Sequence, residues 1–274
     1  MTDLYERLQE TAAILAERTG VESHDVVAVL GSGLGGYPST LDGAVAVPYS
    51  DLPGFPIPRA VGHAGTAYSV RMGDNRVLLL AGRPHAYEGH SMEAVTFPIR
   101  AAVLGGARKV VLTNAAGGCG DGIEPGDLVL ITDHLNLAGI SPLMGPNDER
   151  LGPRFPDMSD VYTPALRDKA HAAAARAGQE LREAVYFWWH GPMFETPAEV
   201  RMARLLGAGL VGMSTVPEAT AARHMGAEVL GLSLCANRAA GMSESRLSAE
   251  EVIAAADAAS DRLRHLFDQL LPTL

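Results

Sequence analysis

Hydrophobic residues recur at helical spacing in some segments of the chain and form short continuous runs in others. Leu4, Leu8, Ala12 and Leu15 recur at helical spacing and Gly20 is a suitable stop, so this segment is predicted to be an N-terminal helix. Apolar runs predict strands at 25–30, 66–72, 76–81, 109–113, 127–132, 185–188, 209–213 and 228–234. Further helices are predicted to begin at Ser91, Thr163, Thr196 and Ser248. The alternation indicates a single α/β domain over residues 1–274, with a mixed central β-sheet flanked by helices.

Composition narrows the class of protein. In 274 residues, 47% are hydrophobic and 20% charged, which excludes a disordered chain. The net charge of −10 argues against a nucleic-acid partner, so any anionic ligand must be held by a local cluster of donors. Apolar runs such as 77–81 fall far short of the roughly 20 residues of a membrane span, and the N-terminus lacks a secretory signal pattern. We therefore expect a cytoplasmic protein with no membrane partner.

A glycine run from Gly31 to Gly36 follows the first predicted strand. It matches the letters of a dinucleotide-binding motif, G-x-G-x-x-G. That motif should open a helix, whereas Pro38, Gly43 and Pro48 leave no room for one before the next strand. A loop that surrounds a lone phosphate with backbone N–H groups remains compatible, as does a plain tight turn.

A polar loop runs from Gly82 to His90, directly after another predicted strand. Arg83 offers a planar fork suited to phosphate, His85 can add a hydrogen bond, and Glu88 can orient either cation. Each histidine singly fits a solvated turn, but strand-end loops are where α/β sheets place ligands. The cluster as a whole therefore indicates an anion site.

Four further segments carry side chains suited to a ligand. Asn114 to Gly118 is small enough for close backbone approach. Phe194 can stack on a flat ring, and Glu195 can accept from a ring N–H or serve only as a helix-entry acid. Ser214 precedes a helix N-terminus, which suits an anion, and Asn237 can both donate to and accept from a purine edge. These groups suit phosphate as nucleophile and an aromatic base as leaving group.

Several other enzyme classes lack their motifs in this sequence. There is no H-E-x-x-H or paired-cysteine spacing for a metal, no G-x-S-x-G elbow and no Gly-Lys-Ser/Thr of a Walker loop. Cys119 and Cys235 form no ligand-spaced cluster. We expect no metal site.

Five motifs stand in order along most of the chain. They are Gly31-Ser-Gly-Leu-Gly35, Gly82-Arg-x-His-x-Tyr-Glu-Gly89, Thr113-Asn-Ala-Ala-Gly-Gly118, Gly191-Pro-x-Phe-Glu-Thr196 and Val211-Gly-Met-Ser-Thr-Val-Pro-Glu218. In this order and spacing the chain resembles the homotrimeric purine nucleoside phosphorylases, from about Val26 to the C-terminal helix. The resemblance implies the nucleoside phosphorylase fold and cleavage of purine nucleosides by phosphate, giving free base and (deoxy)ribose 1-phosphate.

Residue roles follow from the resemblance. It implies a phosphate site of Ser32, His63, Arg83, His85, the Ala115 backbone and Ser214. It implies nucleoside contacts from Tyr87, Gly117, Phe194, Glu195, Val211, Met213 and Asn237, with Phe155 reaching in from a neighbouring subunit. Inorganic phosphate would be co-substrate, with no metal or organic cofactor. Asn237, Glu195 and His85 would carry catalysis, and Asn237 with Glu195 suits 6-oxopurines such as those of inosine and guanosine.

The chain departs from the family pattern at a few positions. Ala249 stands where a histidine that bonds the ribose 5′-hydroxyl is usual, and Ala236 stands where a threonine is usual, followed by Asn237 and Arg238. The segment Tyr186-Phe-Trp-Trp-His190 is unusually bulky. The tryptophans can simply fill core space. Alternatively, Ala249 and Trp189 reshape the sugar pocket for a 5′-modified nucleoside, such as a methylthio one.

A non-catalytic nucleoside-binding relative is a further alternative. Arg83, His85, Ser32 and Ser214 speak against it, because a protein that only binds nucleosides needs no phosphate cluster.

Overall fold

The computed structural model describes residues 3–31, 33–58, 64–243 and 246–274. Ser32 and His63 lie outside the described residues. Six α-helices occur within the described ranges: α1 Leu4–Thr19, α2 Met92–Leu104, α3 Pro164–Arg176, α4 Pro197–Leu205, α5 Val216–His224 and α6 Ala249–Leu270. Nine strands accompany them: β1 Val26–Leu30, β2 Val45–Pro48, β3 Thr66–Met72, β4 Asn75–Ala81, β5 Lys109–Gly118, β6 Leu128–Asn136, β7 Arg182–Trp188, β8 Ala208–Gly212 and β9 Glu228–Arg238. None of these helices is long and apolar enough to cross a membrane.

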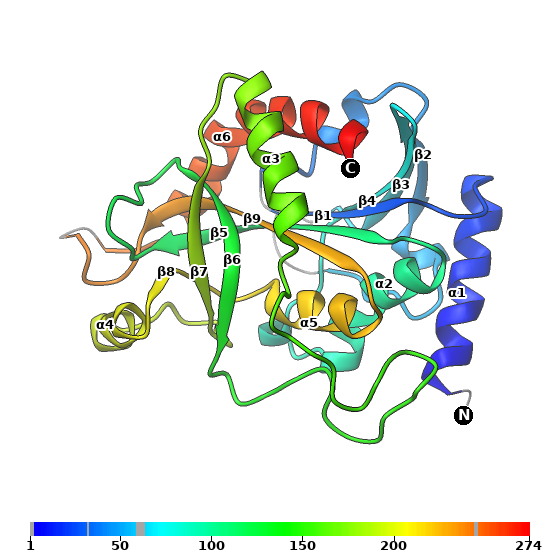
Figure 1. Ribbon diagram of the computed structural model, residues 1–274, viewed down its shortest axis with the longest axis horizontal. Coiled ribbons are helices and arrows are strands. Elements are labelled where there is room, and N and C mark those ends of the chain that lie inside the picture. Colours follow the sequence, from blue (N-terminus) through cyan, green and yellow to red (C-terminus); the bar gives the residue numbers. More distant parts are fainter. Residues whose placement is uncertain (1–2, 32, 59–63, 244–245) are drawn as a thin grey trace.

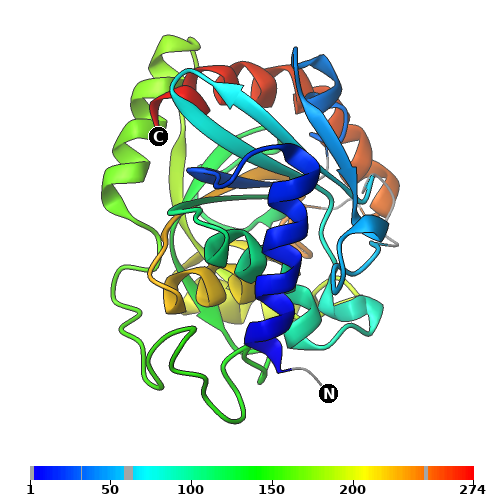
Figure 2. The ribbon, with the colours of Figure 1, turned by 90° about the vertical axis from the view of Figure 1, so that its right-hand side faces the viewer.

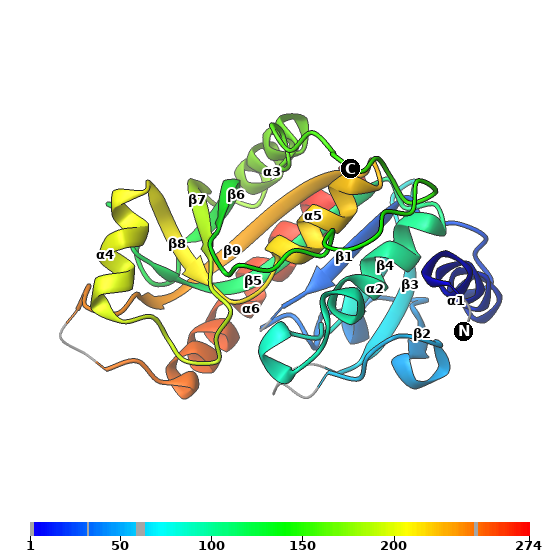
Figure 3. The ribbon, with the colours of Figure 1, turned by 90° about the horizontal axis from the view of Figure 1, so that it is seen from below.

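The strands form one mixed sheet with helices on both faces. Their order is β2-β3-β4-β1-β5-β8-β7-β6-β9. An additional parallel pairing of β5 with β9 closes the last five strands into a ring. In Figure 1, α3 and α6 lie above the strands, while α2 and α5 lie below them. Figure 3 shows α5 and α2 in front of the sheet with α6 beyond it. The expected α/β architecture is confirmed.

Strand β1 explains why the sheet is covered on both faces. All five of its residues are buried, and alternate residues pack in two different cores. Val27 and Val29 join the core with α1 and α2, whereas Val26, Ala28 and Leu30 join the core with α3 and α6. A continuous apolar run is typical of a parallel strand sandwiched between helices.

Local sequence signals fixed several element boundaries. Gly20 ends α1 in the left-handed conformation, with φ of 67°. Thr196 caps α4 by accepting from the Glu199 N–H, and Glu199 returns a bond to the Thr196 N–H, as the capping box predicts. β3 and β4, both predicted as strands, form an antiparallel hairpin. The segment after the glycine run holds only a short 3₁₀ turn, Tyr37–Thr40, so the prediction that no α-helix fits there is confirmed.

Three strands run further at their carboxyl ends than the sequence indicates, and β7 begins earlier, at Arg182. β5 continues through Asn114–Gly118 with a bulge between Ala116 and Gly117, and β9 continues to Arg238. β6 likewise extends to Asn136. These extensions carry small and polar residues, which have weak strand preference, and pairing with neighbouring strands keeps them extended. β2 was not predicted.

The topology gathers strand ends at one place. β1, β4, β5 and β9 run parallel, so their carboxyl ends point the same way. β8 is antiparallel to β5 and pairs only with its last two residues, Gly117 and Gly118. The chain leaving β8 therefore runs back along β5, and the Asn114 side chain reaches Thr215, donating from Nδ2 to Oγ1 at 2.8 Å.

Candidate active site

A cavity of about 330 Å³ lies where these strand ends meet. Its lining residues come from β1, β4, β5, β7, β8, β9 and α6 or from the loops that follow them: Gly31, Arg83, His85, Tyr87, Asn114, Ala115, Ala116, Gly117, Phe194, Glu195, Val211, Gly212, Met213, Ser214, Asn237, Ala239, Ala249, Val252 and Ile253. Twelve of them are residues that the sequence put forward as site residues: Arg83, His85, Tyr87, Ala115, Gly117, Phe194, Glu195, Val211, Met213, Ser214, Asn237 and Ala249. The structure thus brings together residues up to 166 positions apart in sequence.

Two other sequence candidates lie elsewhere. Trp189 is not among the lining residues, because its ring packs edge-on against Phe187 at 5.1 Å between centroids. Phe155 lies on the irregular segment between β6 and α3 and is 89% exposed. Figure 2 shows that segment descending beside the start of α1, where Arg150 pairs with Asp3 at 2.5 Å. The expectation that Phe155 contacts the nucleoside in a neighbouring subunit stays a prediction, because the structure contains a single chain.

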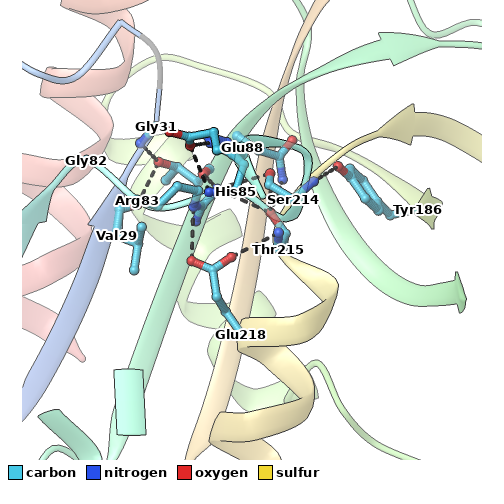
Figure 4. A network of polar contacts seen from close by, with 12 residues as sticks. Val29, Gly31, Gly82, Arg83, His85, Glu88, Tyr186, Ser214, Thr215 and Glu218 are labelled. Atoms are coloured by element: carbon cyan, nitrogen blue, oxygen red, sulfur yellow. Dashed lines mark hydrogen bonds and ion pairs between the residues drawn. The ribbon is translucent and has the colours of Figure 1, made fainter. Parts of the chain in front are cut away.

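Arg83 is the central cation of the site. Its Nε donates to Glu218 Oε1 at 3.0 Å, and both side chains are only 3% exposed. Its NH1 donates to the Thr113 carbonyl at 2.6 Å and to Ser214 Oγ at 3.2 Å. Figure 4 shows Arg83 lying between Glu218 on one side and Ser214 on the other. The guanidinium is therefore held in a fixed orientation before any ligand arrives.

His85 and Glu88 form a second hydrogen-bonded pair. Glu88 Oε1 accepts from the His85 backbone N–H at 2.9 Å and contacts His85 Nδ1 at 3.0 Å. Burial and the nearby Arg83 lower the pKa of His85 to about 4, so the ring is neutral at pH 7. The carboxylate at Nδ1 favours the tautomer with its hydrogen there, so Nε2 is the unprotonated nitrogen. Tyr87 stacks on His85 at 4.6 Å.

The turn that carries Ser214 is strained. Thr215 has φ of 75° and ψ of −49°, and Val216 N donates to the Ser214 carbonyl at 2.8 Å, which defines a γ-turn. Such a backbone is rare for a β-branched residue. Glu218 Oε2 accepts from Thr215 N at 3.0 Å, so the acid that holds Arg83 also holds this turn. We call Arg83, His85, Glu88, Ser214, Thr215 and Glu218 the anion cluster.

Glu195 and Asn237 supply the polar groups of another part of the cavity wall. Burial raises the pKa of Glu195 to about 6, and its Oε1 has no hydrogen-bond partner within the described part of the chain. Asn237 donates one Nδ2 hydrogen to the Arg238 carbonyl at 2.8 Å, which leaves the other for a ligand. Phe194, 38% exposed, offers a ring face nearby in sequence.

Helix α6 contributes a wall without polar side chains. Ala249, Val252 and Ile253 line the cavity, and we call these three residues the α6 wall. The sequence singled out Ala249 but missed Val252 and Ile253. Their spacing of three and four from Ala249, on a helix predicted to start at Ser248, was the available signal.

The other residues missed by the sequence reasoning are of two kinds. Ala116, Gly212, Ala239 and Gly31 offer backbone and small side chains, which give no chemical signal of their own. Gly212 is required sterically, since a Cβ there would lie 2.1 Å from the Tyr186 hydroxyl oxygen. Asn114 lies inside a quoted motif, yet its side chain was given no role. Within the described ranges, no group of three His, Cys, Asp or Glu side chains is placed to hold a metal ion.

Comparison with known proteins assigns the family. The phosphorylase superfamily matches residues 25–272. Purine nucleoside phosphorylase 1 of Geobacillus stearothermophilus is 46% identical over 246 residues, 90% of this chain and 89% of the relative. Purine nucleoside phosphorylase of Mycobacterium leprae is 47% identical over 272 residues, 99% of this chain and 97% of the relative. The crystal structure of Schistosoma mansoni purine nucleoside phosphorylase in complex with inosine has a TM-score of 0.92 at 32% identity, covering 98% of this chain and 96% of that one.

The chain belongs to the phosphorylase superfamily. The resemblance to purine nucleoside phosphorylases that its motifs indicated is confirmed, and so are the nucleoside phosphorylase fold and the expected class of enzyme.

Proposed function

We propose that the protein cleaves the N-glycosidic bond of 6-oxopurine nucleosides, such as inosine and guanosine, with inorganic phosphate. The observation that carries the proposal is that one cavity combines three members of the anion cluster, Arg83, His85 and Ser214, with a buried carboxylate and an amide suited to a purine edge. A protein that only bound nucleosides would have no use for a buried Arg83 locked toward Ser214.

Phosphate is the proposed nucleophile. Arg83, Ser214 and the Ala115 N–H would hold it, and Ser32 and His63 join this site on the sequence resemblance alone. His85 is neutral before phosphate binds, and a bound dianion would favour its protonated form, which can donate from Nε2. Holding phosphate beside the sugar makes the attack effectively unimolecular. No organic cofactor or metal is needed.

The base leaves as its glycosidic bond breaks. The bonding electron pair passes to the purine ring, while a phosphate oxygen bonds to the anomeric carbon, giving free base and (deoxy)ribose 1-phosphate. Asn237 would donate to N7 and Glu195 would accept from N1–H, stabilising negative charge where it develops. A 6-oxopurine carries a hydrogen on N1, whereas a 6-aminopurine presents a lone pair that a carboxylate repels. Glu195 therefore supports 6-oxopurine preference.

Assembly into a homotrimer in the cytoplasm is part of the proposal. Phe155 and Met144, 89% and 71% exposed, lie on the irregular segment between β6 and α3. A neighbouring subunit would cover this segment and receive Phe155 at its own sugar site.

The test is phosphate-dependent base release from inosine, guanosine, adenosine, methylthioadenosine and methylthioinosine in parallel, followed by chromatography. We expect rapid release from 6-oxopurine nucleosides and slow release from adenosine. Release from none of them, with phosphate binding absent by calorimetry, would instead favour a nucleoside-binding protein.

A second candidate is favoured by the α6 wall. Ala249, Val252 and Ile253 offer no hydrogen bond to a sugar hydroxyl, and an unpaired buried hydroxyl costs about 1–3 kcal/mol. An apolar 5′ substituent against the same wall would leave no hydrogen bond unmade. In the parallel assay this candidate predicts that methylthioinosine is released faster than inosine. Trp189, which the sequence also suggested would shape the sugar pocket, does not support this candidate, because Trp189 does not line the cavity.

A further inference from the structure

The side chains of Asn114, Thr215 and Ser214 form a row beside the cavity. Of these three, the proposed reaction gives a role only to Ser214. Asn114 Nδ2 donates to Thr215 Oγ1 at 2.8 Å. Thr215 Oγ1 lies 3.2 Å from Ser214 Oγ. Asn114 is 5% exposed and Thr215 is fully buried, so the hydrogen bond between these two side chains is shielded from water.

The hydrogen bonds of Thr215 can be counted. Its hydroxyl oxygen has two lone pairs and one hydrogen. One lone pair accepts from Asn114. The other faces the second hydrogen of Arg83 NH1 at 3.4 Å, which is shared with Ser214 Oγ because the first hydrogen of NH1 donates to the Thr113 carbonyl. The hydrogen is thus left for Ser214 Oγ. Thr215 is the donor in this pair and Ser214 the acceptor.

The same count fixes Ser214. Its oxygen accepts from Thr215 and faces, at 3.2 Å, the Arg83 NH1 hydrogen that it shares with Thr215, so both of its lone pairs are occupied. Its own hydrogen has no acceptor among the described residues, and Ser214 lines the cavity. A hydroxyl whose lone pairs are both occupied can offer a ligand only its hydrogen, which suits an anion.

The orientation of the Asn114 amide sets the direction of this row. Its Oδ1 is buried with no hydrogen-bond partner in the described ranges, while its nitrogen is spent on Thr215. With the oxygen toward Thr215 instead, the Thr215 hydrogen would turn to Asn114. Ser214 would then donate to Thr215 and present lone pairs to the ligand.

We propose that Asn114 and Thr215 are positioning residues that turn the Ser214 hydroxyl hydrogen toward bound phosphate. The strained turn agrees with this role. Thr215 keeps a φ of 75°, held by Glu218 and by the Val216 N–H, and that backbone places its hydroxyl between Asn114 and Ser214. The inference rests on the proposed function, because it concerns phosphate.

The experiment compares Thr215→Val with Thr215→Ser. Valine keeps the shape and branching but removes the hydroxyl, whereas serine keeps it. We expect the phosphate KM to rise about tenfold in Thr215→Val, the effect of losing one hydrogen bond to a charged group, and less than about twofold in Thr215→Ser. The kcat and the nucleoside KM at saturating phosphate should change little, which a general structural defect would not leave intact. Equal phosphate KM values in the two variants would overturn the proposal.

A double-mutant cycle tests whether Thr215 acts through Ser214. In a Ser214→Ala background there is no hydroxyl to orient, so Thr215→Val should add less than about twofold to the phosphate KM. A full tenfold increase there would mean that Thr215 acts independently of Ser214, which contradicts the proposal.

Asn114→Asp is the second route if valine at position 215 prevents folding. Aspartate only accepts, so it reverses the row and also adds charge. We expect its phosphate KM increase to shrink at least about fivefold in the Ser214→Ala background, whereas repulsion by the charge alone would leave it unchanged. The unaltered protein is assayed first. Absence of phosphate-dependent base release would reject the proposed function and this inference with it, while normal release with unchanged variants rejects the inference alone.

Discussion

The anion cluster and the α6 wall face the same cavity but are built in opposite ways. In the anion cluster each nitrogen donor has an acid behind it, Glu218 for the Arg83 guanidinium and Glu88 for the neutral His85 ring. The α6 wall has no such support, since its three side chains can make only apolar contacts. Fixed charges cannot move without losing partners, whereas an apolar wall can change by one residue at little cost. We therefore expect the proposed attack by phosphate to depend on the cluster, and substrate preference to vary at the wall.

The two regions also differ in how far their parts lie from one another in sequence. The anion cluster joins residues from 83 to 218, and its contacts exist only in the folded chain. The three residues of the α6 wall lie within five positions on one helix. We therefore expect substitutions in the anion cluster to have larger effects than substitutions in the α6 wall.

Removal of Glu218 should break the anion cluster. Glu218→Ala leaves the Arg83 guanidinium buried without its carboxylate, a change that typically costs about 3–5 kcal/mol. We expect a loss of that size in the free energy of unfolding, measured by urea denaturation, together with loss of phosphate-dependent activity. Asp121→Asn, which removes an acid from the exposed pair with Arg204, is the matched control and should change stability by less than about 1 kcal/mol. Equal effects of the two variants would contradict the distinction between buried and exposed pairs.

Glu195 should show a stability cost that serves function. Its pKa is about 6 in the fold against an ordinary 4.5, because burial disfavours the carboxylate. The folded state therefore binds more protons between pH 4.5 and 6, and stability from this group is lost as pH rises through that window. By about pH 8 the ionised group costs about 2 kcal/mol, since each pKa unit corresponds to about 1.4 kcal/mol.

Glu195→Gln tests this cost, because glutamine carries no charge. In urea unfolding of the ligand-free protein, the variant should be more stable than the wild type by up to about 2 kcal/mol at pH 8 and nearly equal at pH 4. Its kcat/KM for inosine should fall at the same time. A variant that is less stable at pH 8 would show that the carboxylate is not strained by burial.

Ala249→His should change the substrate preference set by the α6 wall. A histidine at the start of α6 can bond a sugar hydroxyl, so kcat/KM for inosine should rise about tenfold and that for methylthioinosine should fall. Ala249→Leu is the control, because it adds bulk without a donor and should not raise activity on inosine. No gain from histidine, with the fold intact by circular dichroism, would mean that the wall does not meet the substrate hydroxyl.

Much of the fold was readable from sequence because its signals are local. Gly20, the Thr196 capping box and the apolar runs of β3 and β4 depend on neighbours within a few residues. Strand ends were less readable. Asn114–Gly118 and 235–238 have little strand preference, and they stay extended because β5 and β9 pair with each other. These small, polar extensions are also the segments that line the cavity.

The sequence alone determined the family and most of the groups that bear chemistry. Motifs require particular residue types at fixed spacing, so Arg83, His85, Glu195, Ser214 and Asn237 could be named in advance. The tertiary structure decided how those groups are held and which neighbours join them. The hydrogen bond from Arg83 to Glu218 and the row from Asn114 to Ser214 depend on strand order and on the direction in which β8 runs beside β5. The bonds from Arg83 to Glu218 and from Asn114 to Thr215 join residues 135 and 101 positions apart, so only the folded sheet brings these side chains within bonding distance. The place of the α6 wall against the same cavity is likewise set by the fold.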